Sequence, residues 1–157
     1  GSMDPHTLLV EKLFRAANKM KGFKSFSAYF FHNVPYGMLT RMQDGREERV
    51  PIPRLLNEWT QAHRLVFVGD ASMAPYELFA SMGISRWQDS SGRERSSGLD
   101  WLKMIRRSCP ASIWMNPDPM RWWDHQTVAA IGQVYPMFPL TVDGLRDGIR
   151  ELRKMES

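Results

Sequence analysis

The sequence contains little cysteine and no long apolar run. Cys109 is the only cysteine in 157 residues, which excludes an internal disulfide and a zinc site built from several cysteines. No stretch approaches the about 20 apolar residues that cross a bilayer, and the N-terminus lacks a basic segment followed by an apolar one. We therefore expect one soluble, cytoplasmic domain over 1–157, with Cys109 as part of its core.

The chain also lacks a basic stripe, a metal-binding histidine spacing and a nucleophile elbow. Its 21 basic residues are interspersed with 17 acidic ones, so a basic nucleic-acid-binding domain is an alternative that the charge pattern does not favour. Ser72 lies in Gly-Asp-Ala-Ser-Met, which is not the Gly-x-Ser-x-Gly pattern that exposes a nucleophile. A serine hydrolase using Ser72 is the other alternative, and we do not expect an enzyme.

Helical and strand patterns alternate along the chain. Four-residue apolar runs such as 65–68 predict strands that are buried on both faces, and the charged run 46–49 predicts a solvated loop. The expected strands are 24–31, 38–43 at an edge, 65–68, 111–115 and 137–140. Helices are expected after Asp4, over 53–62, from near Pro75 with Ser72 available as a cap, over 99–107, over 127–134, and after Thr141 as a cap. An exposed loop is expected over 85–98. This order predicts an α/β fold with a mostly parallel sheet and helices on both faces.

Polar side chains follow the ends of these strands, where ligands bind in open α/β sheets. The candidates are His32, Asn33, Asp70, Ser72, Asn116, Asp118 and Thr141. Asp70 comes directly after a strand beside hydroxyl residues, which suits Mg²⁺, although an aspartate in this position also caps turns. Trp114 and Trp122 lie near the same rim, where they either anchor a partner or pack loops onto the sheet.

Five sequence blocks together resemble the CoxE-like branch of the von Willebrand factor A proteins. They are 1–6, 29–33, 68–77, 114–117 and 140–145, and 68–77 is the most specific. The resemblance implies a three-layer, Rossmann-like fold of the von Willebrand factor A type, with one antiparallel edge strand. It also implies a metal-ion-dependent adhesion site, with Ser2 and Asp70 as matching ligands.

Two features depart from that pattern. The first aspartate of the site would lie upstream of Gly1, and the expected threonine loop contains Val50-Pro51-Ile52-Pro53. Gly1-Ser2 is either native or the remnant of a tag. The first central strand would also lie upstream, so we expect a single partial domain over 1–157, whose gap is filled by a re-paired strand or by the partner chain of a homodimer.

The expected function is metal-ion-dependent protein binding. A divalent cation, Mg²⁺ or Mn²⁺, would be held by Asp70 and hydroxyl residues, weakly or not at all in a truncated chain. The resemblance implies a protein partner, either a MoxR-type AAA+ ATPase or a target metalloenzyme, in the assembly or activation of a complex. No membrane contact is expected, and nucleic acid is not an expected partner.

Overall fold

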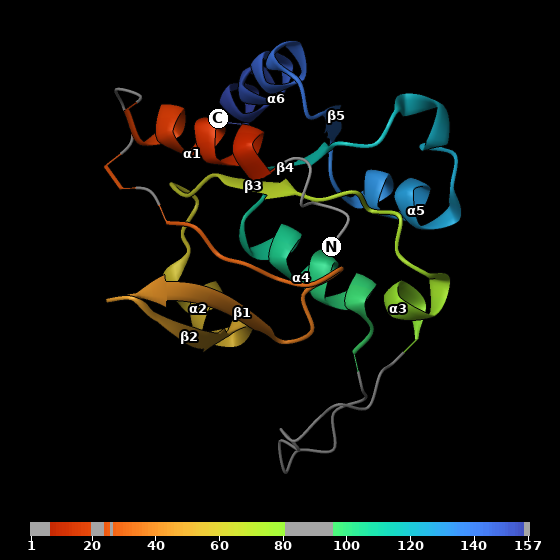
Figure 1. Ribbon diagram of the computed structural model, residues 1–157. Helices are drawn as coiled ribbons and strands as arrows, with labels where there is room; N and C mark the ends of the chain where they lie inside the picture. The colour runs from red at the N-terminus through yellow and green to blue at the C-terminus, as the bar shows by residue number, and fades with distance from the viewer. Residues whose placement is uncertain (1–6, 20–23, 26, 81–95, 156–157) are drawn as a thin grey trace.

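A three-stranded parallel sheet forms the centre of the molecule. The computed structural model describes residues 7–19, 24–25, 27–80 and 96–155 (Figure 1). The sheet consists of β3 (Leu65–Val68), β4 (Ser112–Asn116) and β5 (Met137–Pro139), in the order β3-β4-β5. All three strands are parallel, which confirms the mixed α/β class and the parallel character of the sheet.

Helices cover both faces of this sheet. They are α1 (Thr7–Lys19), α2 (Ile52–Glu58), α3 (Pro75–Phe79), α4 (Gly98–Ser108), α5 (Gln126–Val134) and α6 (Val142–Lys154). Figure 1 shows α1 and α6 on one side of the strands and α4 and α5 on the other. Ile113 of β4 packs in one hydrophobic cluster with Leu152 of α6, whereas its neighbour Trp114 packs in a second cluster with Leu102 of α4. The alternation of side chains along β4 therefore separates two cores.

None of the helices in the described ranges is long and apolar enough to span a membrane.

Several helix starts follow from local sequence. The hydroxyl oxygen of Thr141 accepts a hydrogen bond from the Gly144 N–H at 3.0 Å, which confirms Thr141 as the cap of α6. Ser97 caps α4 in a reciprocal pair with Asp100, and α2 ends at Glu58, earlier than expected. Most of the predicted loop 85–98 lies outside the described residues.

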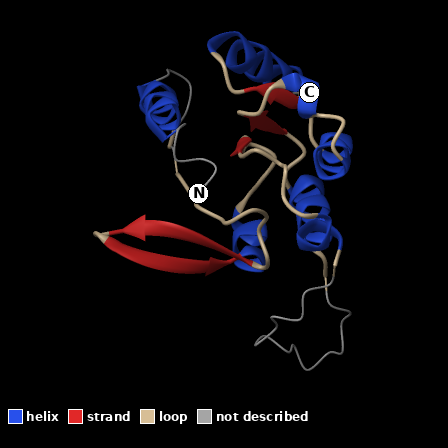
Figure 2. Cartoon of the chain, turned by 45° about the vertical axis from the view of Figure 1, so that its right-hand side comes forward, coloured by secondary structure: helices blue, strands red, loops and turns tan. Residues whose placement is uncertain are grey.

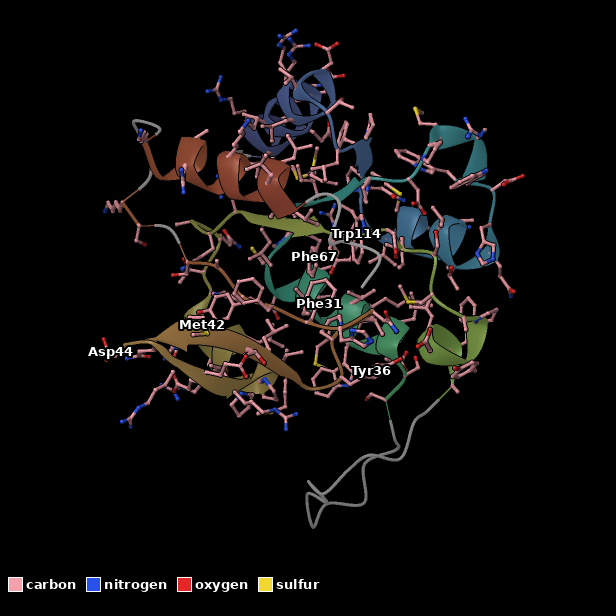
Figure 3. All side chains as sticks on the ribbon, in the orientation of Figure 1. Phe31, Tyr36, Met42, Asp44, Phe67 and Trp114 are labelled. Atoms are coloured by element: carbon pink, nitrogen blue, oxygen red, sulfur yellow. The ribbon has the colours of Figure 1, made fainter. Side chains whose placement is uncertain are left out.

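An aromatic cluster fills the core beneath the sheet (Figure 3). Trp114 stacks on Phe67 with ring centroids 5.2 Å apart and an interplanar angle of 5°. Phe31 meets both rings edge-on, and Tyr135 packs against them at a tilt. Trp114 has no exposed surface, and its Nε1 donates to the Gly69 carbonyl at 2.8 Å. The prediction that Trp114 lies at a partner-binding rim is therefore wrong, because it is an inward-facing residue of the central strand.

The two apolar strands differ in burial. Every residue of β4 is buried, as its sequence predicts. In β3, by contrast, Val66 is 38% exposed. Among the described residues β3 pairs only with β4, so β3 is an edge strand. The prediction that 65–68 is buried on both faces is wrong for this reason.

A separate antiparallel hairpin projects from the body of the molecule (Figure 2). It is formed by β1 (Met38–Gln43) and β2 (Arg46–Pro51), with Asp44 and Gly45 in the turn at φ values of 51° and 73°. The prediction of β1 is confirmed, but its place as an edge strand of the main sheet is wrong. The charged run 46–49 belongs to β2 and is not a loop, because cross-strand pairs such as Arg41–Glu48, at 2.7 Å, hold it against β1.

The predicted strand over 24–31 does not form in its described residues. Its one sheet-like contact is an isolated bridge between Phe30 and Thr40. Tyr29 and Phe31 instead pack against the main core, where they contact the rings of Trp59 and Phe67. Aromatic residues thus favour burial here without strand pairing, since their large apolar area is satisfied by ring packing.

Candidate binding site at the strand ends

The loop after β3 is shaped by hydrogen bonds to its own backbone. Asp70 accepts a bond from the Ser72 N–H to its Oδ1 at 3.2 Å, as expected for an aspartate in a turn. Ala71 has a φ of +60°, a left-handed conformation that costs a residue with a Cβ about 1–2 kcal/mol. This conformation needs support from the surrounding structure.

Thr127 provides that support. It is fully buried at the start of α5, and its hydroxyl donates to the Ala71 carbonyl at 2.8 Å and lies 3.2 Å from the Met73 carbonyl. His125 Nδ1 lies 3.1 Å from the same hydroxyl oxygen. The loop bearing Ser72 is thereby fixed to α5.

The loop after β4 is fixed in a similar way. Asn116 is fully buried, and its Oδ1 accepts a hydrogen bond from the Asp118 N–H at 2.8 Å. The short helix η2 (Met120–Trp122) follows, and Trp123 Nε1 donates to the Asp118 carbonyl at 3.0 Å. Two side chains therefore set the position of Asp118 from the two sides of the loop.

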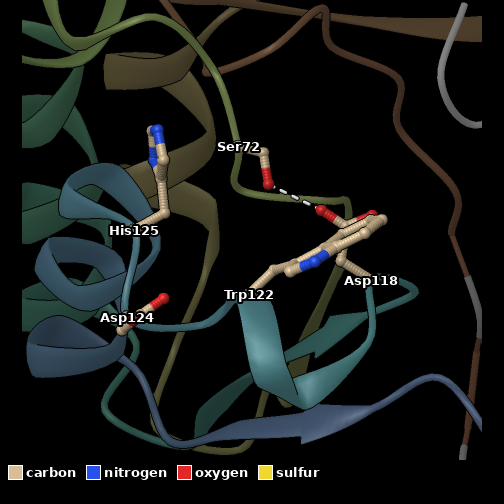
Figure 4. A pocket seen from close by; sticks show the side chains of 5 residues that line it. All are labelled: Ser72, Asp118, Trp122, Asp124 and His125. Carbon is tan, nitrogen blue, oxygen red and sulfur yellow. Dashed lines mark hydrogen bonds between the residues drawn. The ribbon is translucent and has the colours of Figure 1, made fainter.

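The two loops meet through one side-chain hydrogen bond. Ser72 Oγ donates to Asp118 Oδ2 at 2.6 Å, a length typical of a hydroxyl bonded to a charged carboxylate. The bond forms one wall of an open pocket of about 380 Å³, lined by Ser72, Asp118, Trp122, Asp124 and His125. In Figure 4, Ser72 and Asp118 point toward each other, with Trp122 next to Asp118. This pocket is the candidate site.

A second hollow, of about 460 Å³, lies against the hairpin and is lined by Gln43, Asp44, Arg46 and Glu48. None of these four side chains is buried. A hollow lined by polar and charged side chains, with no apolar residue in its wall, lacks the usual character of a ligand site. The pocket at the strand ends is therefore the better candidate, although it is the smaller one.

No family model, curated protein or solved structure matches this chain in the three comparisons.

The structure brings together only some of the residues expected at the rim. Ser72 and Trp122 line the pocket, and Asp70 lies in the same loop with its Oδ1 bonded to the Ser72 N–H. Asn116 is completely buried, so the prediction that it contacts a partner is wrong; it positions Asp118 from below. Ser2 lies outside the described residues.

His32 and Asn33 lie in a different setting. His32 is exposed and lines neither pocket. Asn33 Nδ2 donates to Glu77 Oε1 at 2.6 Å, and Glu77 also accepts from the Ala74 N–H at the start of α3. Tyr36 donates to the Glu77 carbonyl, and burial, followed by the Glu77 charge, raises the pKa of its phenol. Asn33 therefore fastens the chain to α3, and Ser72 does not cap that helix.

Sequence reasoning missed two residues of the pocket, Asp124 and His125, which precede α5. Asp118 was among the strand-end candidates, but it was not expected as a metal ligand or as a partner contact. The signal for Asp124 and His125 was positional, since residues just before a helix that follows a strand lie at the carboxyl edge of the sheet.

The donor atoms suit a hard cation that keeps most of its water. Ser72 Oγ and Asp118 Oδ2 are adjacent oxygen donors, and Mg²⁺ in proteins is often held by one or two carboxylates and several waters. Within the described ranges, no group of three or more histidine, cysteine, aspartate or glutamate residues is arranged to hold a metal ion. The residues therefore fit a solvated divalent cation and not an ion enclosed by protein ligands.

Proposed function

We propose that this chain is a metal-ion-dependent protein-binding module whose contact surface is the pocket at the carboxyl ends of β3 and β4. The single observation that carries the proposal is the 2.6 Å bond between Ser72 and Asp118, which joins two strand-end loops beside an exposed tryptophan. We further infer a Rossmann-like fold of the von Willebrand factor A type, acting with a MoxR-type AAA+ ATPase or a target metalloenzyme in assembly or activation of a complex.

The cation would be held by Asp118 and Ser72, with Asp70 as a further carboxylate in the same loop. When bound, the ion supplies positive charge and exchangeable water at the pocket. Ser72 Oγ would offer a lone pair to the ion, and Asp118 would neutralise part of its charge. A carboxylate of the partner would complete the site, which favours acidic segments as ligands.

Trp122 supplies the apolar part of the contact. Its ring is 53% exposed at the pocket wall, and the Arg121 guanidinium lies 5.1 Å from the ring centroid. Tryptophan and arginine are enriched among residues that dominate protein–protein binding energy. Since the cation–π contact also limits the motion of both side chains, less entropy is lost when a partner covers them.

The hydrolase alternative is less favoured by these contacts. A serine nucleophile requires a base that takes its proton, most often a histidine. Ser72 donates to the Asp118 carboxylate, and none of its hydrogen bonds within the described residues is to a histidine. Covalent labelling of Ser72 by a serine-directed probe, abolished in Ser72→Ala, would support the hydrolase and contradict the binding module.

Cation binding is tested by titrating Mn²⁺ into the chain and following the free ion by electron paramagnetic resonance. We expect Asp118→Asn to weaken binding by at least about tenfold, because changes at or next to a metal ligand cost about 10–100-fold in affinity. Asp70→Asn measures the share of the second carboxylate. Asp143→Asn, an 86% exposed aspartate on α6, is the matched control and should bind as the unaltered chain does. Equal binding by Asp118→Asn and the control would contradict the assignment.

Partner binding is tested with a purified MoxR-type AAA+ ATPase encoded in the same genome, by surface interferometry in Mg²⁺ and in EDTA. Trp122→Ala should weaken the complex about 30-fold, which corresponds to a hot-spot loss of about 2 kcal/mol. Val142→Ala, at a residue 72% exposed on α6, is the control. Binding that is unchanged by EDTA and by Trp122→Ala would refute the proposed site.

A further inference from the structure

The edge of β3 that faces away from β4 carries backbone groups with the geometry to pair with another strand. The N–H group of Leu65 donates to the Ala111 carbonyl just before β4, at 3.0 Å, and that of Gly69 donates to the Met115 carbonyl in β4, at 3.1 Å. Successive residues of a strand direct their backbone groups to opposite sides, so those of Val66 and Val68 point away from β4. No strand among the described residues pairs with them, and Val66 is 38% exposed.

Sheet edges of this kind usually carry a lysine, a proline or a bulge that prevents pairing. β3 has none of these, since its sequence is Leu-Val-Phe-Val. Charged residues flank the strand, with Arg64 directly before it and Asp70 two positions after its last residue, Val68. The charge therefore changes sign from one end of the edge to the other.

We propose that β3 pairs with β3 of a second copy of this chain, antiparallel and centred on Phe67. In that register Val66 lies opposite Val68 of the second copy, and both have outward backbone groups, so each such pair exchanges two hydrogen bonds. Arg64 lies opposite Asp70 of the second copy, and the twofold axis creates this pair twice. The two sheets join into one continuous sheet.

Charge selects this register over its alternatives. A shift of two residues pairs Arg64 with Val68 and leaves Asp70 without an opposite charge. In a parallel, in-register pairing, Arg64 faces Arg64 and Asp70 faces Asp70, which is unfavourable for like charges directly opposite each other. Only the register centred on Phe67 satisfies both the direction of the backbone groups and the charges.

The neighbours of the edge lie above and below the plane of the sheet. α1 contributes Val10 and Leu13 to the cluster that contains Val68, on one face. Phe31 packs against Phe67 on the other face. Both contacts lie on the faces of the sheet. An incoming strand would lie in the plane of the sheet, where it would meet the backbone groups of Val66 and Val68.

Sedimentation equilibrium of the whole chain, in EDTA, tests the proposal. The expected result is a monomer–dimer equilibrium that Val66→Lys abolishes, because lysine at an edge position opposes pairing. Val142→Lys, the same change at an exposed valine on α6, should leave the dimer intact. Circular dichroism of each variant confirms that it remains folded.

Exchange of the two charges tests the register. Arg64→Asp should weaken the dimer about 2- to 30-fold, as estimated for two cross-strand charge pairs, and Arg64→Asp with Asp70→Arg should restore it. Both the single and the double variant lose the bonds from Arg64 to the Gln61 and His63 carbonyls. A tighter dimer in the double variant therefore reports the charge pairing alone. A monomer at every concentration, a dimer that survives Val66→Lys, or a double variant no tighter than Arg64→Asp would overturn the proposal. Trp122→Ala should not alter the dimer, which keeps this test separate from that of the proposed function.

Discussion

The buried hydroxyl of Thr127, at the start of α5, should contribute to the free energy of unfolding. This hydroxyl bonds to the Ala71 carbonyl, lies 3.2 Å from the Met73 carbonyl and lies 3.1 Å from Nδ1 of His125. In Thr127→Val the shape is kept but these bonds are lost, which leaves a buried carbonyl on Ala71 without its donor. A buried polar group left unsatisfied costs about 1–3 kcal/mol. For a chain of this length the melting temperature should fall by about 2–12 °C.

Urea denaturation followed by circular dichroism measures this loss of unfolding free energy. Thr40→Val is the matched control, because Thr40 is half-buried in β1 and its hydroxyl takes part in no hydrogen bond among the described residues. The control should change stability by less than about 0.5 kcal/mol. If Thr127→Val is as stable as the control, the Ala71 carbonyl is not held by Thr127, and the account of the left-handed loop is wrong.

Two further predictions concern helices. Gly132→Ala should stabilise the chain by about 0.5–1 kcal/mol in thermal denaturation, since a Cβ there meets nothing within 4 Å. Gly144→Ala should instead destabilise the chain strongly, because its Cβ would lie 1.9 Å from the Pro139 carbonyl oxygen. Equal effects of the two substitutions would refute this difference in packing. Hydrogen bonds from Ser97 lower the pKa of Asp100 below its usual 3.8, so Asp100 contributes stability that is present above that pH and lost as the pH falls below it. The stability difference between the unaltered chain and Asp100→Asn should therefore shrink in urea titrations at decreasing pH, and a constant difference would count against the cap.

The sequence predicted best those elements whose signal is local. The cap at Thr141 and the strand expected over 111–115 each depend on signals within a few residues. The cap is confirmed, and the strand is found at Ser112–Asn116. The hairpin was half missed, because the charged residues 46–49 of β2 are not buried and lack the apolar alternation by which strands are recognised. The Asp44-Gly45 turn was its available signal, since this dipeptide favours two-residue hairpin loops.

The expected site lies at the strand ends, where the structure also places the pocket, and only part of the pocket lining was expected. Asn116 and Asp118 were both strand-end candidates, but only Asn116 was expected to contact a partner. The two residues are two positions apart, so the alternation of side chains along a strand does not distinguish them. What distinguishes Asp118 is its contact with Ser72, 46 positions away, about which local sequence carries no information.

Asp70 connects the two proposals, because it lies both in the loop of the pocket and at the end of the β3 edge. If its carboxylate holds the cation, the same group is withdrawn from Arg64 of the second copy, and Mn²⁺ must weaken the dimer. Linkage then requires dimerisation to weaken Mn²⁺ binding by the same factor. If Asp118 and Ser72 hold the ion without Asp70, the dimer constant is the same in Mn²⁺ and in EDTA. Sedimentation equilibrium in both conditions therefore decides which carboxylate the ion uses, and Asp118→Asn should remove any effect of Mn²⁺ that depends on the pocket.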